Sequence, residues 1–427
     1  MKISHLEARE ILDSRGIPTI ETDIILEDGT HAEAQVPSGT SSGATEVVEL
    51  RDNDPSRYFG KGVLKAIEKV EKEIFPAVAN KEFNTQRELD QFLIELDGTE
   101  NKSNLGGNSI LSVSMAFCRA SALSKKLPLY EYFGQLYWGN SYNKTLLKMP
   151  EPMILILEGG AHGNWSTDFQ EYMIVPKGPR FTDFEDKLRA GAEIFKTVHD
   201  ILNERGISTG VGLEGAFSPN EMKSNTEAFE IMLLGAERAG YKPNDEIVIA
   251  LDIASSEFYD KETGLYNLKK EGLKLNRSDW MALQQKWFKE YPIWSLEDGL
   301  DQADWEGWVE YMKLFGAEHQ VVGDDFLTTN VKRISKAIEM DSVNSVLIKL
   351  NQIGTISETL DAIRMTVDNG WEAVVSHRSG EANDSMVADL VVGTPANQCK
   401  LGGPDRGERL AKYNRLLEIE KELGLGD

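Results

Sequence analysis

Hydrophobic and polar residues alternate along residues 1–35, and the pattern then changes to a helical period. The first stretch contains two β-rich runs, with turn signals at Arg15-Gly16 and Asp28-Gly29. From residue 60 to 140, apolar residues recur three and four positions apart with glutamates and lysines between them, and the stretch closes with a continuous helix rich in small residues. These patterns predict an α+β domain over residues 1–140.

After residue 140, short apolar runs that each end in a polar or charged residue alternate with helical stretches. The predicted strands are PMILILEGG, DFQEYMIVP, VGLEG, EIVIALD, YPIWSLED, HQVVGDD, SVLIKLN, EAVVSH and ADLVVG. Such alternation is typical of βα units in a mostly parallel sheet, and this number of units favours a closed barrel. The predicted fold class is α/β: a (β/α)8 barrel over residues 141–427, preceded by a smaller α+β capping domain.

Charged residues fall at the ends of successive predicted strands, and one more lysine follows at a similar interval. The strand-end residues are Asp252, Glu297, Asp324, Lys349 and the pair His377-Arg378, and the further lysine is Lys400, at successive intervals of 45, 27, 25, 28 and 23 residues. A barrel takes roughly 25–35 residues for each βα unit, and its active site lies at the C-terminal ends of the strands. We therefore expect these side chains to meet at one mouth of the barrel.

Three of these residues are carboxylates, and no cysteine lies near them in the sequence. Asp252, Glu297 and Asp324 would form a hard oxygen site of the kind that suits Mg²⁺. Lys349 would lie one strand beyond the last of them. A lysine flanked by a metal ion and further cations has a depressed pKa, so it can act as a general base near neutral pH.

Composition narrows the choice of partners and compartment. The 46 lysines and arginines against 70 aspartates and glutamates give a net charge of 46 − 70 = −24, and no basic stretch interrupts this acidity, which argues against a nucleic-acid partner. No apolar run approaches the roughly 18 residues of a membrane span, and the first 16 residues lack a signal-peptide core. Cys118 and Cys399 fit no metal or redox pattern. These features predict a soluble cytoplasmic protein.

Ten stretches of the chain resemble the enolase family. They are AREILDSRGIPTIE, VPSGTSSGATEVVELRD, GKGVLKA, LGGNSILSVSMA, ALDIASSEFY, SLEDGLDQADWEGW, QVVGDDFLTTN, IKLNQIGTISET, VSHRSGE and RLAKYNRLLEIE. The resemblance covers nearly the whole chain. It implies an enolase-type barrel, Mg²⁺-dependent dehydration of 2-phosphoglycerate to phosphoenolpyruvate as in glycolysis, and a homodimer or higher homo-oligomer.

The resemblance also implies roles for individual residues. The implied metal ligands are Asp252, Glu297 and Asp324 for a first Mg²⁺, and Ser41 in the loop SGTSSG for a second ion that arrives with the substrate. The implied catalytic residues are Lys349 as the base that removes the α-proton, Glu214 as the acid that helps the 3-hydroxyl leave, Glu171 beside it, and His162 on a mobile loop. The implied substrate contacts are Arg378 and Ser379 at the phosphate, with His377 adjacent, Lys400 at the carboxylate end, and Gln170.

This chemistry places a demand on the acid, because Glu214 or its partner must hold a proton near neutral pH. Crowding of Glu214 with Glu171 would raise one of the two pKa values, and the two would titrate as a coupled pair.

The chain departs from the usual enolase residues around this acid. The departures are Glu158 where enolases usually have Asn, Gly163 for Ala, Leu213 and Ala216 in GLEGAFSP for Asp and Gly, and Ala382 and Asn383 in GEAND. They leave two alternatives to dehydration. One is an enolase-like enzyme with altered chemistry on a phosphoglycerate or phosphonate ligand, like the carboxyphosphonoenolpyruvate synthases of phosphonate biosynthesis, which transfer to a phosphoglycerate hydroxyl. The other is a non-catalytic binding protein, which the intact acid, base and ligand set disfavours.

Overall fold

The first domain begins with three antiparallel strands. The computed structural model describes residues 1–40, 43–79 and 81–425. Its first sheet has the order β1 (Ile3–Leu12), β2 (Pro18–Leu26) and β3 (His31–Gln35). The turns fall at the two predicted positions, where Gly16 and Gly29 have positive φ angles that other residues rarely adopt.

Helices follow this sheet, as the pattern predicted. They are η1 (Tyr58–Gly60), α1 (Leu64–Lys69), η2 (Val70–Ile74), α2 (Phe75–Val78), α3 (Gln86–Asp97), α4 (Gly107–Ser124), α5 (Leu129–Trp138), η3 (Gly139–Ser141) and η4 (Lys144–Leu146). The prediction of one continuous helix after residue 106 is wrong. Residues 125–128 separate α4 from α5, because Pro128 lacks an N–H group and starts a new helix as its N-cap.

Eight strands form the closed barrel that the sequence predicts. In order around the barrel they are β10 (Ile293–Glu297), β11 (Gln320–Gly323), β12 (Ser345–Ile348), β13 (Glu372–Ser376), β14 (Gln398–Lys400), β4 (Glu151–Glu158), β5 (Glu171–Pro176) and β6 (Ile247–Asp252). Only β5 runs antiparallel to both neighbours. Its first residue, Glu171, therefore lies at the same mouth as the last residues of the other strands.

Two of the predicted strands do not belong to the barrel. ADLVVG lies in helix α13 (Met386–Val392), whose seven residues are all buried, so its sequence lacks the polar face that marks a helix. VGLEG is a loop, in which Val211 makes only an isolated bridge to Phe217. The eighth strand is instead β14, which is too short and too polar at its ends to be recognised from the pattern.

The helices around the barrel start at capping side chains. These helices are α6 (Phe184–Glu204), α7 (Asn225–Arg238), α8 (Arg277–Glu290), α9 (Trp305–Phe315), α10 (Val331–Met340), α11 (Leu350–Ile353), α12 (Ile356–Asp368), α13 and α14 (Gly407–Glu422). Six of them have an N-cap oxygen that accepts an N–H of the first turn: Asp183, Ser224, Asn276, Asp304, Asn330 and Thr355. The short helix η5 (Ser255–Glu257) and a small sheet, β7 (Tyr259–Asp260), β8 (Leu265–Leu268) and β9 (Leu273–Leu275), are inserted between β6 and α8.

The barrel interior is filled with side chains. Met153, Leu155, Met173, Val175, Ala250, Val322, Leu347 and Val374 form a buried cluster there, and Ala216 of the loop after α6 joins it. The barrel is therefore a packed core and not a pore, as is usual for this architecture. Chemistry is confined to the mouth above this cluster.

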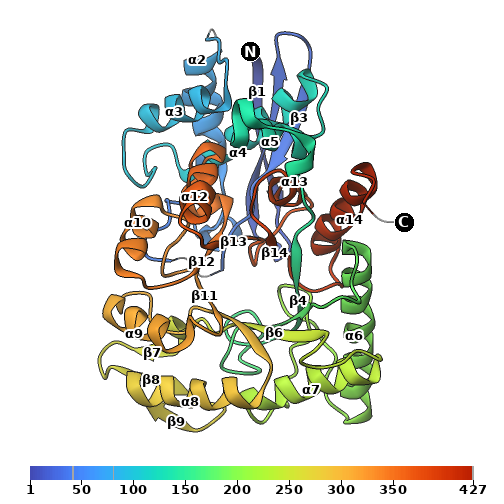
Figure 1. Ribbon diagram of the computed structural model, residues 1–427. Coiled ribbons are helices and arrows are strands. Elements are labelled where there is room, and N and C mark those ends of the chain that lie inside the picture. The colour runs from blue at the N-terminus through green and yellow to red at the C-terminus, as the bar shows by residue number, and fades with distance from the viewer. Residues whose placement is uncertain (41–42, 80, 426–427) are drawn as a thin grey trace.

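The first domain packs against the mouth end of the barrel (Figure 1). Helix α4 lies between the sheet β1–β3 and helices α11 and α12. The segment that follows β3 crosses toward the mouth: Ser38 bridges Gly380, and Thr45 hydrogen-bonds Thr328 at 2.7 Å. A wall of the mouth is thus supplied by a segment far away in sequence.

Among the helices of the described ranges, none combines the length and the apolar character needed to cross a lipid bilayer.

Candidate active site

The structure places the predicted charged residues at one end of the barrel. Asp252, Glu297 and Lys400 are the last residues of β6, β10 and β14, and Asp324, Lys349 and His377 directly follow β11, β12 and β13. The spacing along the sequence thus corresponds to successive strand ends. The unusually long first interval, 45 residues, contains the inserted sheet β7–β9.

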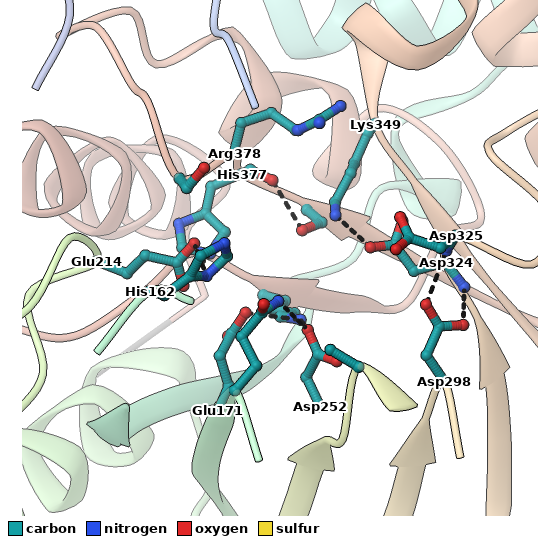
Figure 2. Close-up of a pocket in the computed structure, with 15 residues that line it drawn as sticks. His162, Glu171, Glu214, Asp252, Asp298, Asp324, Asp325, Lys349, His377 and Arg378 are labelled. Atoms are coloured by element: carbon teal, nitrogen blue, oxygen red, sulfur yellow. Dashed lines mark hydrogen bonds and ion pairs between the residues drawn. The ribbon is translucent and has the colours of Figure 1, made fainter. Parts of the chain in front are cut away.

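These side chains surround one pocket (Figure 2). Its lining includes Asp252, Asp324, Lys349, His377, Arg378, Ser379 and Lys400 from the strand ends, and His162, Gln170, Glu171 and Glu214 from the loops and β5. Glu297 does not line the pocket but lies directly behind Lys400. Ser41, the expected ligand of a second metal ion, lies outside the described residues.

Lys400 connects three carboxylates on one side of the pocket. Its Nζ lies 2.8 Å from both oxygens of Glu297, 3.1 Å from Asp252 Oδ2 and 3.1 Å from Glu171 Oε1. Burial alone would lower the Lys400 pKa, but the three carboxylates raise it well above its ordinary value. Lys400 is therefore a fixed positive charge that neutralises part of a dense anionic cluster.

Lys349 has a single carboxylate partner. Its Nζ lies 2.5 Å from Asp324 Oδ2. Burial is the largest influence and lowers the Lys349 pKa, and Arg378 and Lys400 lower it too, but Asp324 and Glu297 act in the other direction and the pKa is raised overall. The depressed pKa expected from the sequence applies to a lysine beside a bound metal ion and stays a prediction.

Glu214 lies between two histidines on the opposite side of the pocket (Figure 2). Its Oε1 is 3.2 Å from His162 Nδ1, and its Oε2 is 3.5 Å from His377 Nε2. Burial raises the Glu214 pKa, but His162, His377 and Arg409 together bring it well below its ordinary value. Since Arg409 Nη1 lies 2.7 Å from His377 Nδ1 and can only donate, His377 carries its proton on Nε2, facing Glu214.

Two other buried carboxyls near Glu214 favour the protonated form. Burial, followed by the charge of Glu214, raises the Glu171 pKa well above its ordinary value and the Glu158 pKa to about 8. The expected coupling of Glu171 with Glu214 therefore raises the pKa of Glu171 and not that of Glu214. A proton near neutral pH is held beside Glu214 and not on it.

The guanidinium of Arg378 lies where the chain from the first domain reaches the mouth. Its Nη1 is 3.1 Å from Glu46 Oε2 and 3.0 Å from Asn351 Oδ1. Ser379 Oγ donates to Thr40 Oγ1 at 2.8 Å and accepts from the main-chain N–H of Thr40 at 2.8 Å. These two residues form a polar, positively charged corner that can bind an oxyanion such as phosphate.

The strand-end carboxylates have the donor chemistry of a hard-cation site, but their ligand atoms are not all within 4.8 Å of one another in this structure. Asp252, Glu297 and Asp324 offer only oxygen ligands, and Asp252 Oδ1 is buried without a hydrogen-bond partner among the described residues. Oxygen donors of this kind suit Mg²⁺ better than they suit metals that prefer histidine or cysteine. Two groups at the mouth do have ligand atoms within 4.8 Å of one another. One is Asp298, Asp324 and Asp325, which offers only oxygens, and the other is His162, Glu171 and Glu214, which includes a histidine nitrogen and is a poorer match for Mg²⁺.

Sequence reasoning missed several residues of the site. Glu46 and Asn351 contact Arg378. Gln352 donates a hydrogen bond to Asp324 Oδ1 at 2.9 Å. Asp298 accepts hydrogen bonds from the main-chain N–H groups of Asp324 and Asp325 at 3.0 and 2.8 Å. Of these, Asp298 carried a signal, since it follows Glu297 at the end of a predicted strand. The contact between Arg378 and Glu46 joins positions 332 residues apart and follows from no local pattern.

The fold and the site together define a two-domain barrel protein in which buried acids, bases and cation ligands converge at the barrel mouth. Comparison with known families is specific: the enolase C-terminal TIM barrel domain matches residues 146–426, and the enolase N-terminal domain matches residues 3–133. The chain belongs to the enolase family, and as such it is an enzyme of the enolase superfamily.

Proposed function

We propose that the protein is a Mg²⁺-dependent lyase that dehydrates 2-phosphoglycerate to phosphoenolpyruvate. The observation that carries this proposal is the position of Lys349 and of the Glu214 group on opposite sides of one pocket (Figure 2). Loss of water from a β-hydroxy acid needs a base at the α-carbon and an acid at the β-hydroxyl, and these two groups must face different parts of the same small substrate.

The proposed reaction moves one proton at each end of the substrate. Neutral Lys349 Nζ takes the α-proton, and the electron pair of that C–H bond is delocalised into the carboxylate as an enediolate. This electron pair then forms the new carbon–carbon double bond as the bond to the 3-hydroxyl breaks. The departing hydroxide receives a proton from the Glu214 group, in which Glu171 holds one, and leaves as water. Atoms and charge balance without an oxidant or reductant.

The ends of the substrate would be held by fixed charges. Arg378 and Ser379 would bind the phosphate, which would replace Glu46 as the partner of the guanidinium. Lys400 would face the substrate carboxylate. When held by Asp252, Glu297 and Asp324, Mg²⁺ would supply positive charge beside that carboxylate and would offset the Asp324 charge that raises the Lys349 pKa.

An assay with purified protein tests the proposal. Incubation with 2-phosphoglycerate and Mg²⁺ should produce phosphoenolpyruvate absorbance, chelation should stop it, and renewed Mg²⁺ should restore it. The variant Asp252→Asn should need more Mg²⁺ for half-maximal rate. Turnover at background in the presence of saturating Mg²⁺ and substrate would refute dehydration as the function.

One observation favours a second candidate function. The acid loop carries Leu213 and Ala216, and the buried carboxyl of Glu158 lies beneath it, so the surroundings of Glu214 differ from those usual in enolases. The alternative is a transferase like the carboxyphosphonoenolpyruvate synthases, acting at a phosphoglycerate hydroxyl. Product analysis separates the two, because a transferase would leave 2-phosphoglycerate alone intact and would consume it only with a phosphonate co-substrate.

The remaining proposals follow from family membership. We infer a cytoplasmic homodimer or higher homo-oligomer that acts on a small phosphorylated carboxylate. Light scattering of the purified protein should give at least twice the mass of one chain, 47.7 kDa. A mass of one chain at assay concentration would overturn the oligomer.

A further inference from the structure

Glu158 is a buried acidic residue that the proposed reaction does not use. It ends strand β4 and is 1% exposed. Its carboxyl group faces the loop 210–218, which carries Glu214 and has no helix or strand of its own apart from the isolated bridges of Val211 and Phe217. An irregular loop keeps one position only if its main-chain groups are bound, so the partners of this loop decide where Glu214 lies.

Both oxygens of Glu158 bind main-chain N–H groups of this loop. The N–H of Ala216 donates to Oε1 at 3.1 Å, and the N–H of Glu214 donates to Oε2 at 3.1 Å and to Oε1 at 3.3 Å. The approach is close, since a Cβ on Gly212 would lie 2.4 Å from Glu158 Cδ. A larger residue at this position would push the Glu158 carboxyl group out of its place.

The main chain of Glu158 also binds the loop 210–218, and in addition it binds the loop that carries His162. Its N–H donates to Phe217 O at 2.9 Å, and its carbonyl accepts from Ser166 Oγ at 2.8 Å. A Cβ on Gly163 would lie 2.2 Å from that carbonyl oxygen. The loop that carries His162 and the loop that carries Glu214 therefore meet on one residue.

We propose that Glu158 is a positioning residue that fixes the Glu214 loop, and with it the acid side of the reaction, through the two main-chain N–H groups bound by its carboxyl oxygens. The proposal rests on the proposed dehydration for its catalytic consequence but not for the positioning itself. Glu158 does not line the pocket and acts through Glu214. Lys349, on the opposite side, is held by Asp324 and Thr329 and is independent of Glu158.

Above about pH 8, where the Glu158 carboxyl is ionised, the variant Glu158→Gln removes one of the two acceptors and keeps the size of the side chain. The amide NH₂ group of glutamine would face an N–H donor of the loop, so the loop should lose one anchor and open more often. Amide hydrogen exchange of residues 210–218, measured by mass spectrometry, should become faster, while exchange in β12 and β13 should not change. If the glutamine variant folds poorly, Glu158→Asp replaces it. This variant keeps both acceptors on a shorter side chain, so amide exchange of residues 210–218 should be faster than in wild type and slower than expected for Glu158→Gln.

The catalytic readout separates positioning from a general loss of structure. In Glu158→Gln the dehydration kcat should fall by about 10²-fold, the cost of a misplaced catalytic group. Exchange of the α-proton of 2-phosphoglycerate with deuterated water depends on Lys349 and should persist, with KM altered by less than about threefold. Equal losses of exchange and dehydration, or unchanged amide exchange in residues 210–218, would overturn the proposal.

A matched control and the wild-type protein complete the test. Glu151→Gln, at the other end of β4, removes a carboxylate that pairs with Lys187 at 2.9 Å and should leave both loop exchange and activity unchanged. If the wild-type protein does not act on 2-phosphoglycerate, the proposed function fails. Amide exchange alone then decides the role of Glu158, with faster exchange supporting it and unchanged exchange refuting it.

Discussion

Two buried lysines at the barrel mouth differ in the number of carboxylates that they contact. Lys400 contacts Glu171, Asp252 and Glu297, whereas Lys349 contacts only Asp324. Each carboxylate stabilises the protonated amine, so Lys400 loses its proton much less readily than Lys349. Of the two, Lys349 is therefore the candidate base, and Lys400 is a permanent positive charge.

Replacement of Lys349 tests this assignment. Lys349→Ala should reduce both dehydration and α-proton exchange by about 10²- to 10⁴-fold, the usual contribution of a general base. Proton exchange in deuterated water, followed by NMR of 2-phosphoglycerate, provides the measurement. Lys286→Ala, an exposed lysine on α8, is the matched control and should leave both rates unchanged. Undiminished exchange in Lys349→Ala would assign the base elsewhere.

Glu158 also predicts how stability depends on pH. Its pKa is about 8 in the folded protein, raised first by burial and then by Glu214, against about 4.3 in an unfolded chain. The folded state thus binds the Glu158 proton more tightly than the unfolded chain does. The stabilisation that this proton gives the folded state is complete below about pH 4.3 and is lost as the pH rises to about 8. Between pH 6.5 and 8, the free energy of unfolding should decrease in wild type and decrease less in Glu158→Gln.

Urea unfolding at several pH values provides this measurement. The comparison is between the slopes of the two proteins, because titrating groups distant from Glu158 contribute equally to both. Identical slopes would mean that Glu158 is already ionised at pH 6.5 in the folded protein.

Residue identity and spacing gave much of the site but not all of it. The strand-end residues were predictable because a barrel repeats every βα unit and directs strand ends to one mouth. Glu46 and Glu158 were not, because each acts on a residue more than 50 positions away through contacts that exist only in the folded chain. The ion pair between Lys349 and Asp324 was not predictable either, because it depends on distance in the folded chain and not on sequence order.

Among helices and strands, the sequence predicted those that have one apolar face and one polar face. The helices α3, α9, α10 and α12 follow their apolar periodicity closely. Short elements buried on all sides gave no such signal, so α13 was predicted as a strand and β14 was missed. The reversed direction of β5 could not be predicted either, because the direction of a strand leaves no trace in its hydrophobic pattern.

Helix α12 shows how an element of the barrel depends on the first domain. Its first main-chain N–H groups donate to side chains of α3 and α4: Ile356 N–H to Ser114 Oγ at 3.0 Å, and Ser357 N–H to Asp90 Oδ2 at 2.8 Å. Asp90 also accepts from Ser114 Oγ and from Gln86 Nε2, and is fully buried. The N-terminus of a barrel helix is thus capped by the other domain.

Removal of this cap should destabilise the whole protein. Asp90→Ala removes the acceptor of the Ser357 N–H and of Ser114 Oγ, and one of the acceptors of Gln86 Nε2, so the free energy of unfolding should fall by about 1–3 kcal/mol. Urea unfolding checks the value. Glu95→Ala, on the exposed face of the same helix, removes only a surface contact with Gln91 and should change stability by less than about 0.5 kcal/mol. Equal effects of the two substitutions would show that the interdomain cap contributes nothing.

At the scale of the whole molecule, the two domains share one hydrophobic core. A single buried cluster extends from Ile3 in β1 to Ile419 in α14. We therefore expect the domains to unfold together. Tryptophan fluorescence reports mainly on the barrel, because Trp138 is the only one of the eight tryptophans that precedes residue 141, whereas far-UV circular dichroism reports on both domains. The two signals should give the same urea midpoint, and separate midpoints would show independent domains.

At this scale the net charge of the chain must be distinguished from the charge around the pocket. The chain carries −24 overall, and the pocket proposed for a small polyanion is lined by Lys349, Arg378 and Lys400 but also by six carboxyl groups. Anion binding there would therefore depend on the positive charge that bound Mg²⁺ supplies, whereas the acidity of the distant surface is largely screened.

The burial of helix α4 limits how the first domain can be combined with other barrels. Fifteen of the 18 residues of α4 are buried, between the first sheet on one side and α11 and α12 on the other. A helix covered in this way has no face of its own to vary, so the first domain is not an interchangeable module. A chimera that joins residues 1–140 to another barrel would carry α4 to a surface shaped for different side chains. It would need matching side chains on the barrel side of that helix before it could fold.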